Sequence, residues 1–125
     1  MKRILILLLT LITLQGPAQT QPAPKSNRVH DVFLGYLTEK FNLTPAEKKQ
    51  LRPIVIQYLA DSKKISKTEQ DPLLREQERI ALKINYRKRF TPVIGEPRAT
   101  RFFSEEQVFR KKIREELNKR NVKEN

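Results

Sequence analysis

Cysteine and tryptophan are absent from this chain of 125 residues, which holds one histidine, His30, and three glycines. Without cysteine the chain can form no disulfide and carry no lipid on a cysteine, and a zinc site built from sulfur and imidazole ligands is excluded. The glycines are isolated, so no phosphate-binding loop is expected. We therefore predict a protein that is not an enzyme and that has no catalytic residue, no metal and no cofactor.

The remaining candidates for acid–base chemistry are two pairs of adjacent acids, Glu105–Glu106 and Glu115–Glu116. Neighbouring residues on a helix point in different directions and cannot share a proton. We expect both pairs to be solvated helix surface. His30 follows a polar segment near the start of the first predicted helix, and we expect it to be a solvated surface residue as well.

One long apolar run occurs, at the start of the chain. Two basic residues precede the apolar segment 4–14, and small residues follow it up to Ala18. This order is typical of a bacterial secretory signal, and the run is too short for a bilayer core, which needs about 20 residues. The sequence predicts a signal peptide over residues 1–18, cleavage after Ala18 and a periplasmic protein that begins at Gln19. An uncleaved anchor is the alternative.

The predicted mature chain has a strong excess of positive charge. Without the two cations of the signal peptide, Lys and Arg number 24 against 14 acidic residues, and residues 79–125 hold 14 of these cations against 6 acids. Such a surplus would favour nucleic acid in a cytoplasmic protein, but export removes that partner. Acidic segments of envelope proteins and anionic envelope lipids remain as partners, with a merely solvated basic surface as the alternative.

Apolar residues recur every three or four positions after a polar leader, which predicts an all-α fold. Thr44, Pro45 and Glu47 have the spacing of a capping box with proline at the first helical position. Pro53 predicts a bend in the following helix, and Pro92 predicts the end of the third. The expected segments are a flexible leader over 19–27, one domain over 28–120 with helices near 29–41, 45–67, 73–90 and 97–119, and a polar tail over 121–125.

The third predicted helix is apolar on two sides, and so needs two neighbours, of which one can be a second copy of the chain. One stripe is Leu73, Ile80 and Ile84; the roughly opposite one is Leu82, Tyr86, Phe90 and Val93. The last predicted helix has an inward stripe of Ala99, Phe102, Phe103, Phe109, Ile113 and Leu117. Core packing is the expected role of Phe33, Tyr36, Phe41 and Phe109.

Two clusters combine charge with exposed helix surface. Tyr86 and Phe90 are interleaved with three cations, and a second run of cations lies on the last helix. Rings set among cations suit flexible polypeptide segments that are themselves apolar and acidic, although core packing of the rings is the alternative. The predicted partner-binding residues are Tyr86, Arg87, Lys88, Arg89, Phe90, Arg110, Lys111 and Lys112.

The segment Leu43-Thr44-Pro45-Ala46-Glu47 resembles the LTxxQ signature of the Spy/CpxP family of periplasmic stress proteins, with Glu47 in the glutamine position. Residues 78–117 also resemble divergent Bacteroidetes members, down to the terminal segment Glu106-Gln107-Val108-Phe109-Arg110. The likeness covers about Phe41 to Leu117. A second LTxxQ copy, expected at the start of the last helix, is replaced by Ile94-Gly95-Glu96-Pro97.

This resemblance implies an elongated, bent helical hairpin that dimerises into a shallow cradle. Its basic, partly apolar face would hold unfolded envelope proteins without ATP. The alternative is a regulatory protein that binds one envelope partner, such as an accessory of a sensor kinase or an anti-sigma-type factor. A third interpretation is a structural or lipid-binding protein that uses the clusters Arg87–Arg89 and Arg110–Lys112.

Overall fold

The computed structural model describes residues 25–124 of the chain, and every regular element in that part is a helix. The predicted signal peptide, its cleavage site and most of the leader lie outside the described residues. The prediction of an all-α fold with four helices is confirmed. The helices are α1 (Lys25–Phe41), α2 (Pro45–Thr68), α3 (Pro72–Ile94) and α4 (Glu96–Glu124).

The start of α2 confirms the predicted capping box. The hydroxyl of Thr44 accepts a hydrogen bond from the Glu47 amide at 3.1 Å, and the Glu47 carboxylate accepts one from the Thr44 amide at 3.0 Å. Pro45 stands in the first turn, where its missing N–H removes no helix bond. Leu43, just before the cap, is buried in the core. The helix runs through Pro53, and the bend expected there stays a prediction.

Two helix boundaries differ from the prediction because a helix does not need apolar residues to continue. α1 begins at Lys25, inside the segment predicted as a flexible leader, and α4 runs to Glu124, through the predicted polar tail. Lysine, arginine and glutamate are good helix formers. Apolar periodicity marks only the part of a helix that is buried, so it underestimates helices that extend into solvent.

α3 also continues further than predicted, through Pro92 to Ile94. The proline lies in the last turn, where it removes only one helix bond, and the burial of Ile94 in the core offsets that loss. Gly95 ends the helix, with a positive φ of 80° that glycine adopts without strain, and its amide donates to the Thr91 carbonyl at 2.8 Å.

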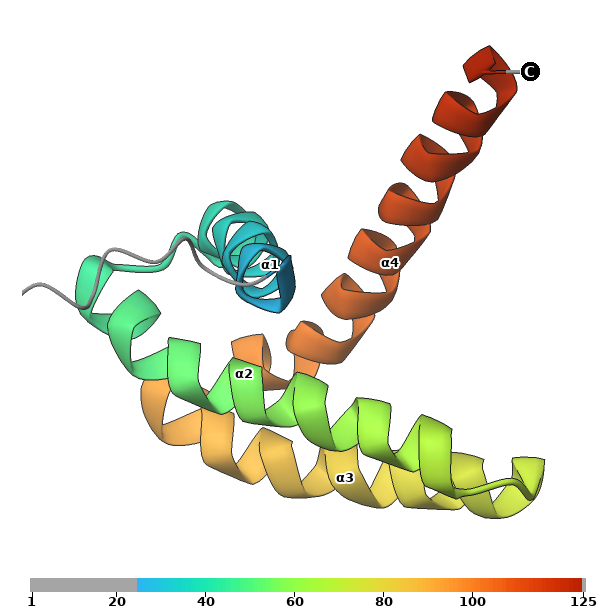
Figure 1. Cartoon of the computed structure of the whole chain (residues 1–125). Helices are drawn as coiled ribbons and strands as arrows, with labels where there is room; N and C mark the ends of the chain where they lie inside the picture. Colours follow the sequence, from blue (N-terminus) through green and yellow to red (C-terminus); the bar gives the residue numbers. More distant parts are fainter. Residues whose placement is uncertain (1–24, 125) are drawn as a thin grey trace, which may run out of the picture.

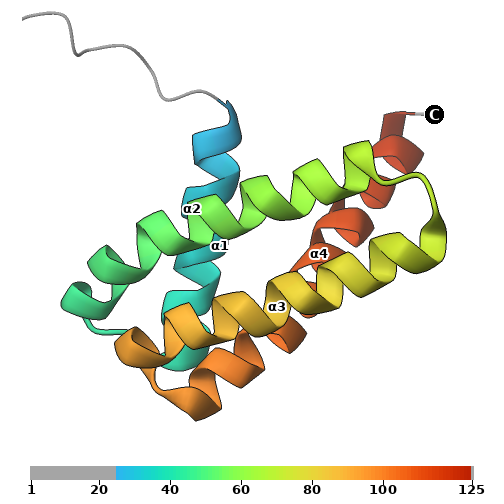
Figure 2. The ribbon, with the colours of Figure 1, turned by 90° about the horizontal axis from the view of Figure 1, so that it is seen from below.

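α2 and α3 lie side by side as an antiparallel hairpin, whose tip is the turn between residues 68 and 72 (Figures 1 and 2). α1 contacts α2 and α4, close to the base of the hairpin. α4 contacts α3 and then projects away from the hairpin, so that the two form an open angle (Figure 1). The elongated hairpin predicted from the sequence is therefore present, with a long fourth helix as an arm.

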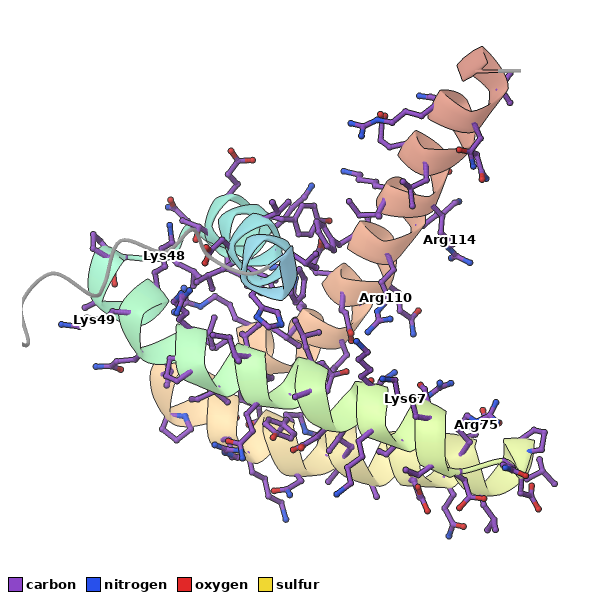
Figure 3. The ribbon with its side chains drawn as sticks, viewed as in Figure 1. Lys48, Lys49, Lys67, Arg75, Arg110 and Arg114 are labelled. Carbon is purple, nitrogen blue, oxygen red and sulfur yellow. The ribbon has the colours of Figure 1, made fainter. Side chains whose placement is uncertain are left out.

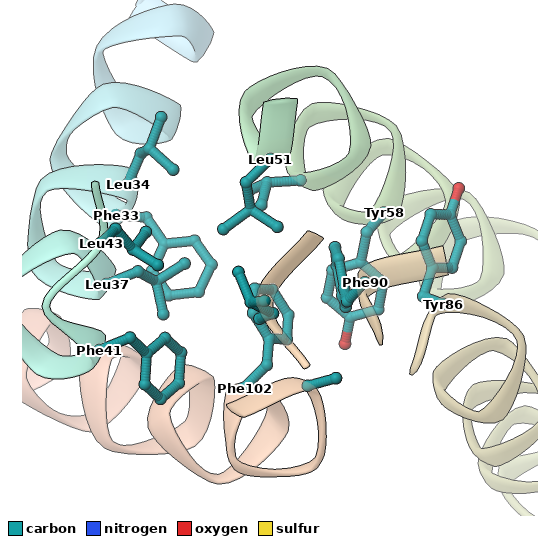
Figure 4. Packing of buried hydrophobic residues seen from close by; sticks show 13 residues of the cluster. Phe33, Leu34, Leu37, Phe41, Leu43, Leu51, Tyr58, Tyr86, Phe90 and Phe102 are labelled. Carbon is teal, nitrogen blue, oxygen red and sulfur yellow. The ribbon is translucent and has the colours of Figure 1, made fainter. Parts of the chain in front are cut away.

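Aromatic rings make up six of the thirteen buried core residues, which lie where the four helices meet (Figure 4). The rings of Phe90 and Phe102 lie 4.3 Å apart between centroids, and Tyr58 packs edge-on against Phe102 at 5.5 Å. Burying each such side chain contributes on the order of 1.5–3 kcal/mol, which compensates for the absence of disulfides. Core packing of Phe33, Tyr36, Phe41 and Phe109 is confirmed, two fully and two partly buried.

Candidate partner-binding surface

Two of the predicted binding residues, Tyr86 and Phe90, lie in the core and not on the surface. Their side chains are 2% and 0% exposed, because α2 and α4 both pack on this side of α3. The Tyr86 hydroxyl donates to the Asp61 carboxylate of α2 at 2.5 Å. Burial, aided by this carboxylate, raises the pKa of Tyr86 to about 12. The prediction that these rings contact a partner is wrong for the folded chain.

The three cations between these rings point in different directions. Arg89 lies against the Tyr86 ring, 4.8 Å from its centroid, and donates to the side-chain amide oxygen of Gln57 at 2.9 Å. Arg87 and Lys88 are exposed, and within residues 25–124 their side chains join no ion pair or hydrogen bond. The run therefore does not form one cationic surface with the rings.

The cations predicted on the last helix are also divided. Arg110 forms an ion pair with Glu106 at 2.8 Å, and Lys112 lies over the Tyr36 ring at 5.3 Å from its centroid. Lys111 is exposed on the far side of α4. Arg110 and Lys112 thus flank one face of the helix, where both remain within reach of a partner, and Lys111 does not.

The prediction for the acidic pair Glu105–Glu106 is wrong, because Glu106 is 4% exposed. Its carboxylate accepts from the Tyr58 hydroxyl at 2.6 Å and from Arg110, while neighbouring Glu105 accepts from the Tyr36 hydroxyl at 2.7 Å. The two carboxylates do point apart, toward α2 and α1. The other pair, residues 115 and 116, is exposed as expected.

Sequence reasoning missed a shared feature of the tyrosines: all three donate to a carboxylate on another helix. Burial raises the pKa of Tyr58 and, to about 12, that of Tyr36, with the acceptor carboxylates adding to the effect. These pairs bridge α1 to α4, α2 to α4 and α3 to α2. A tyrosine on an apolar stripe has a hydroxyl that needs a hydrogen-bond acceptor when it is buried, but the spacing of residues in the sequence cannot identify that acceptor.

The surface that remains available for a partner is formed by α4 beyond its core contacts. Phe109 is the last residue of the stripe that packs on α1, with ring centroids 5.0 Å from Phe33 and 5.3 Å from Tyr36. The next two residues of the same stripe, Ile113 and Leu117, are 41% and 52% exposed. They were predicted to face inward. They do lie on the same face of α4 as Phe109, but α4 projects beyond the core, so no other helix covers this part of it (Figure 1).

Arg110 and Arg114 border this exposed stripe along one edge. At about 100° per residue, Glu116 and Arg120 lie along the other edge, Lys112 and Lys119 lie further round the helix, and Lys119 forms an ion pair with Glu116 at 3.8 Å. Figure 3 shows Arg110 and Arg114 on the side of α4 that faces the hairpin. We call this region the arm surface; it consists of Arg110, Lys112, Ile113, Arg114 and Leu117.

The hairpin contributes charge opposite the arm. Figure 3 shows Lys67, near the end of α2, and Arg75, near the start of α3, on the side of the hairpin tip that faces α4. Arg75 donates to the carbonyls of Glu69 and Gln70 and so stabilises the turn. Positive charge therefore borders the open angle on the hairpin side and on the α4 side, which favours an acidic occupant.

Other polar features of the described residues are less suited to binding. A groove of about 330 Å³ between α1 and α2 is lined by Asp31, Leu34, Pro45, Lys48, Lys49 and Arg52, and the ion pair of Asp31 with Arg52 at 3.0 Å lies in its wall. His30 is half-buried and so is not the solvated surface residue that the sequence predicted. Among the described residues its Nδ1 atom has no hydrogen-bond partner. Residues 25–124 contain no cluster of three or more His, Cys, Asp or Glu side chains placed to bind a metal.

No family model, no curated protein and no solved structure matches the chain. Within the described residues, none of the helices combines the length and the apolar character needed to cross a membrane.

Proposed function

We propose that this chain is an exported binding protein that holds unfolded envelope proteins on its arm surface without ATP. The observation that carries the proposal is the continuation of a core stripe into solvent. Ile113 and Leu117 follow Phe109 on one face of α4, yet they remain about half exposed beside Arg110 and Arg114. An apolar stripe that continues from the core onto a projecting helix offers a partner an uncovered contact surface.

The chemistry of the arm surface suits segments that are apolar and acidic. Burying an isoleucine or leucine side chain contributes on the order of 1.5–3 kcal/mol, so a segment that covers both residues gains useful affinity without a deep pocket. The cations attract acidic segments before contact, and salt limits this attraction to about 10 Å at 0.1 M. A shallow surface of this kind imposes little shape selectivity, which favours many clients over one.

The test is a light-scattering assay in which a chemically unfolded test protein aggregates in the presence of residues 19–125, without nucleotide. The double variant Ile113→Ser/Leu117→Ser should lose most of the protection at every salt concentration. Val108→Ser is the matched control, because Val108 is similarly exposed at 43% but lies off the stripe. Circular dichroism should show that all three chains keep their helix content.

The charged edge is tested separately through Arg114, which forms no ion pair within residues 25–124. Arg114→Ser should weaken protection at low salt and have little effect at high salt, whereas Lys111→Ser on the far side should change neither. The proposal fails if the folded protein does not protect several unrelated clients at a few-fold molar excess. That result would favour the regulatory protein with one dedicated partner.

A further inference from the structure

The groove between α1 and α2 is small compared with a protein-binding surface, but its size suits a small ligand, whose pockets begin at about 300 Å³. Its volume is about 330 Å³, and its lining consists of Asp31, Leu34, Pro45, Lys48, Lys49 and Arg52. The buried Leu34 and the ring of Pro45 supply apolar surface. The carbon chains of the basic residues extend this surface, because long basic side chains cover apolar groups and keep only the charged end in water. The groove therefore combines apolar walls with a charged rim.

The rim is positive, because three cations and one acid line the groove. The acid, Asp31, is already paired: the Nε and Nη2 atoms of Arg52 both donate to its Oδ1 atom, at 3.3 and 3.0 Å. Lys48 and Lys49 are exposed, and within residues 25–124 neither side chain takes part in an ion pair. Figure 3 shows both lysines near the start of α2. Two ammonium groups are therefore available to a ligand in the groove.

The stability of α2 does not account for the position of these lysines. Lys48 and Lys49 lie among the first five residues of the helix, near the positive end of its dipole, which disfavours cations. Lys48 and Arg52 are also one turn apart on the same face, where like charges repel each other. A bound anion relieves both effects, because the lysines and the helix dipole attract it together.

We propose that this groove binds a small organic anion with an apolar chain, such as a medium-chain fatty acid. Its carboxylate contacts the ammonium groups of Lys48 and Lys49, and its chain lies along Leu34 and Pro45. Complementarity to both halves of the groove selects this occupant. A neutral apolar molecule leaves the lysines without an anion, and an inorganic anion leaves the apolar walls in water. The site is independent of the proposed function, because the groove and the arm surface share no residue.

The test is an NMR titration of nitrogen-15-labelled residues 19–125 with sodium octanoate below its micelle-forming concentration. Amide signals of residues 31–35 and 45–52 should shift in a saturable way, with a dissociation constant of about 1 mM. Those of residues 110–117, on the arm, should not shift. Acetate has the charge without the chain and octanol the chain without the charge, so each should bind at least about tenfold more weakly. From butanoate to octanoate, each added CH₂ group should tighten binding about two- to fourfold.

Variants of the rim should change the affinity in opposite directions. Lys48→Ser/Lys49→Ser should weaken octanoate binding about tenfold at low salt and less at high salt. Lys63→Ser/Lys64→Ser is the matched control, because it removes an equally exposed pair from the same helix outside the groove. Asp31→Asn should tighten binding about threefold, since it removes the acid of the lining and releases its arginine partner.

Three results would overturn the proposal: no saturable shift below the micelle-forming concentration, shifts in residues 110–117 instead, or unchanged affinity of the Lys48→Ser/Lys49→Ser chain. Circular dichroism should show that each variant keeps its helix content, as expected for substitutions of exposed residues. Octanoate binding needs no client protein, so this site and the proposed function can fail separately.

Discussion

Arg98 of α4 forms an ion pair with Glu47 of α2, the residue that closes the capping box. The same guanidinium donates to the Phe41 carbonyl at 3.1 Å and to the Ile94 carbonyl at 2.7 Å, at the ends of α1 and α3. One side chain therefore connects all four helices. The segment around Thr44 resembles a family signature. Within this chain its role is structural, because Glu47 binds the arginine that connects the four helices. We call this set of contacts the joint.

Acid should weaken this joint. Hydrogen bonds from Arg98, and then from the Thr44 amide, lower the pKa of Glu47 below its ordinary value of 4.5. A lowered pKa in the folded state stabilises the fold above the unfolded-state value, and that stabilisation is lost as the pH falls through the folded-state pKa. Urea midpoints should therefore decline below about pH 4.5, and less so in Glu47→Gln than in the wild type. Identical acid profiles for the two chains would contradict this role.

Tyr58→Phe should destabilise the protein more than Tyr36→Phe does. Removing the Tyr58 hydroxyl leaves the buried Glu106 carboxylate without one of its donors, which costs about 1–3 kcal/mol. Tyr36 and its acceptor Glu105 are only partly buried, so water replaces the lost bond more easily. Urea unfolding followed by circular dichroism measures both variants. Equal destabilisation would show that Glu106 is hydrated.

Alkali should unfold the protein through its tyrosines. The folded-state pKa of Tyr36 and that of Tyr86 are both raised from 10.0 to about 12. A raised pKa stabilises the fold fully below the unfolded-state value, and the contribution is lost as the pH rises through the folded-state pKa. Helix content and tyrosinate absorbance should therefore change together between pH 10 and 12. Tyrosinate formation near pH 10 with the helices intact would refute the buried arrangement.

Phe90→Ser should act on stability and not directly on binding. Truncation of a fully buried phenylalanine costs about 3–5 kcal/mol, since Phe90 contacts the rings of Phe102 and Tyr58. Arg87→Ser on the same helix should leave the unfolding free energy almost unchanged, because that side chain is exposed. Thermal and urea unfolding of the two variants provide the comparison. A Phe90→Ser chain as stable as the wild type would show that this ring does not lie in the core.

Local signals in the sequence were sufficient for several elements. The capping box at Thr44 depends on residues within one turn, and so does the start of α3, where the Asp71 carboxylate accepts from the amides of Leu73 and Leu74; neighbouring positions therefore determine both. The helical class follows from the same periodic pattern. Helix ends at Lys25 and Glu124 were not predictable in this way, because a solvated helix end has no apolar signal.

Tertiary packing decided which face of each helix is buried. The sequence of α3 carries two apolar stripes, and nothing in their composition distinguishes the one around Tyr86 from the one around Ile80. The distinction arises because α2 and α4 pack on one side of α3 only. In α4 a single stripe runs from Phe102 to Leu117. Phe109 is covered because it packs on Phe33 and Tyr36 of α1, whereas Ile113 is exposed because α4 projects away from the other helices beyond this contact. Periodicity specifies a face, whereas burial depends on the length and direction of the neighbouring helices.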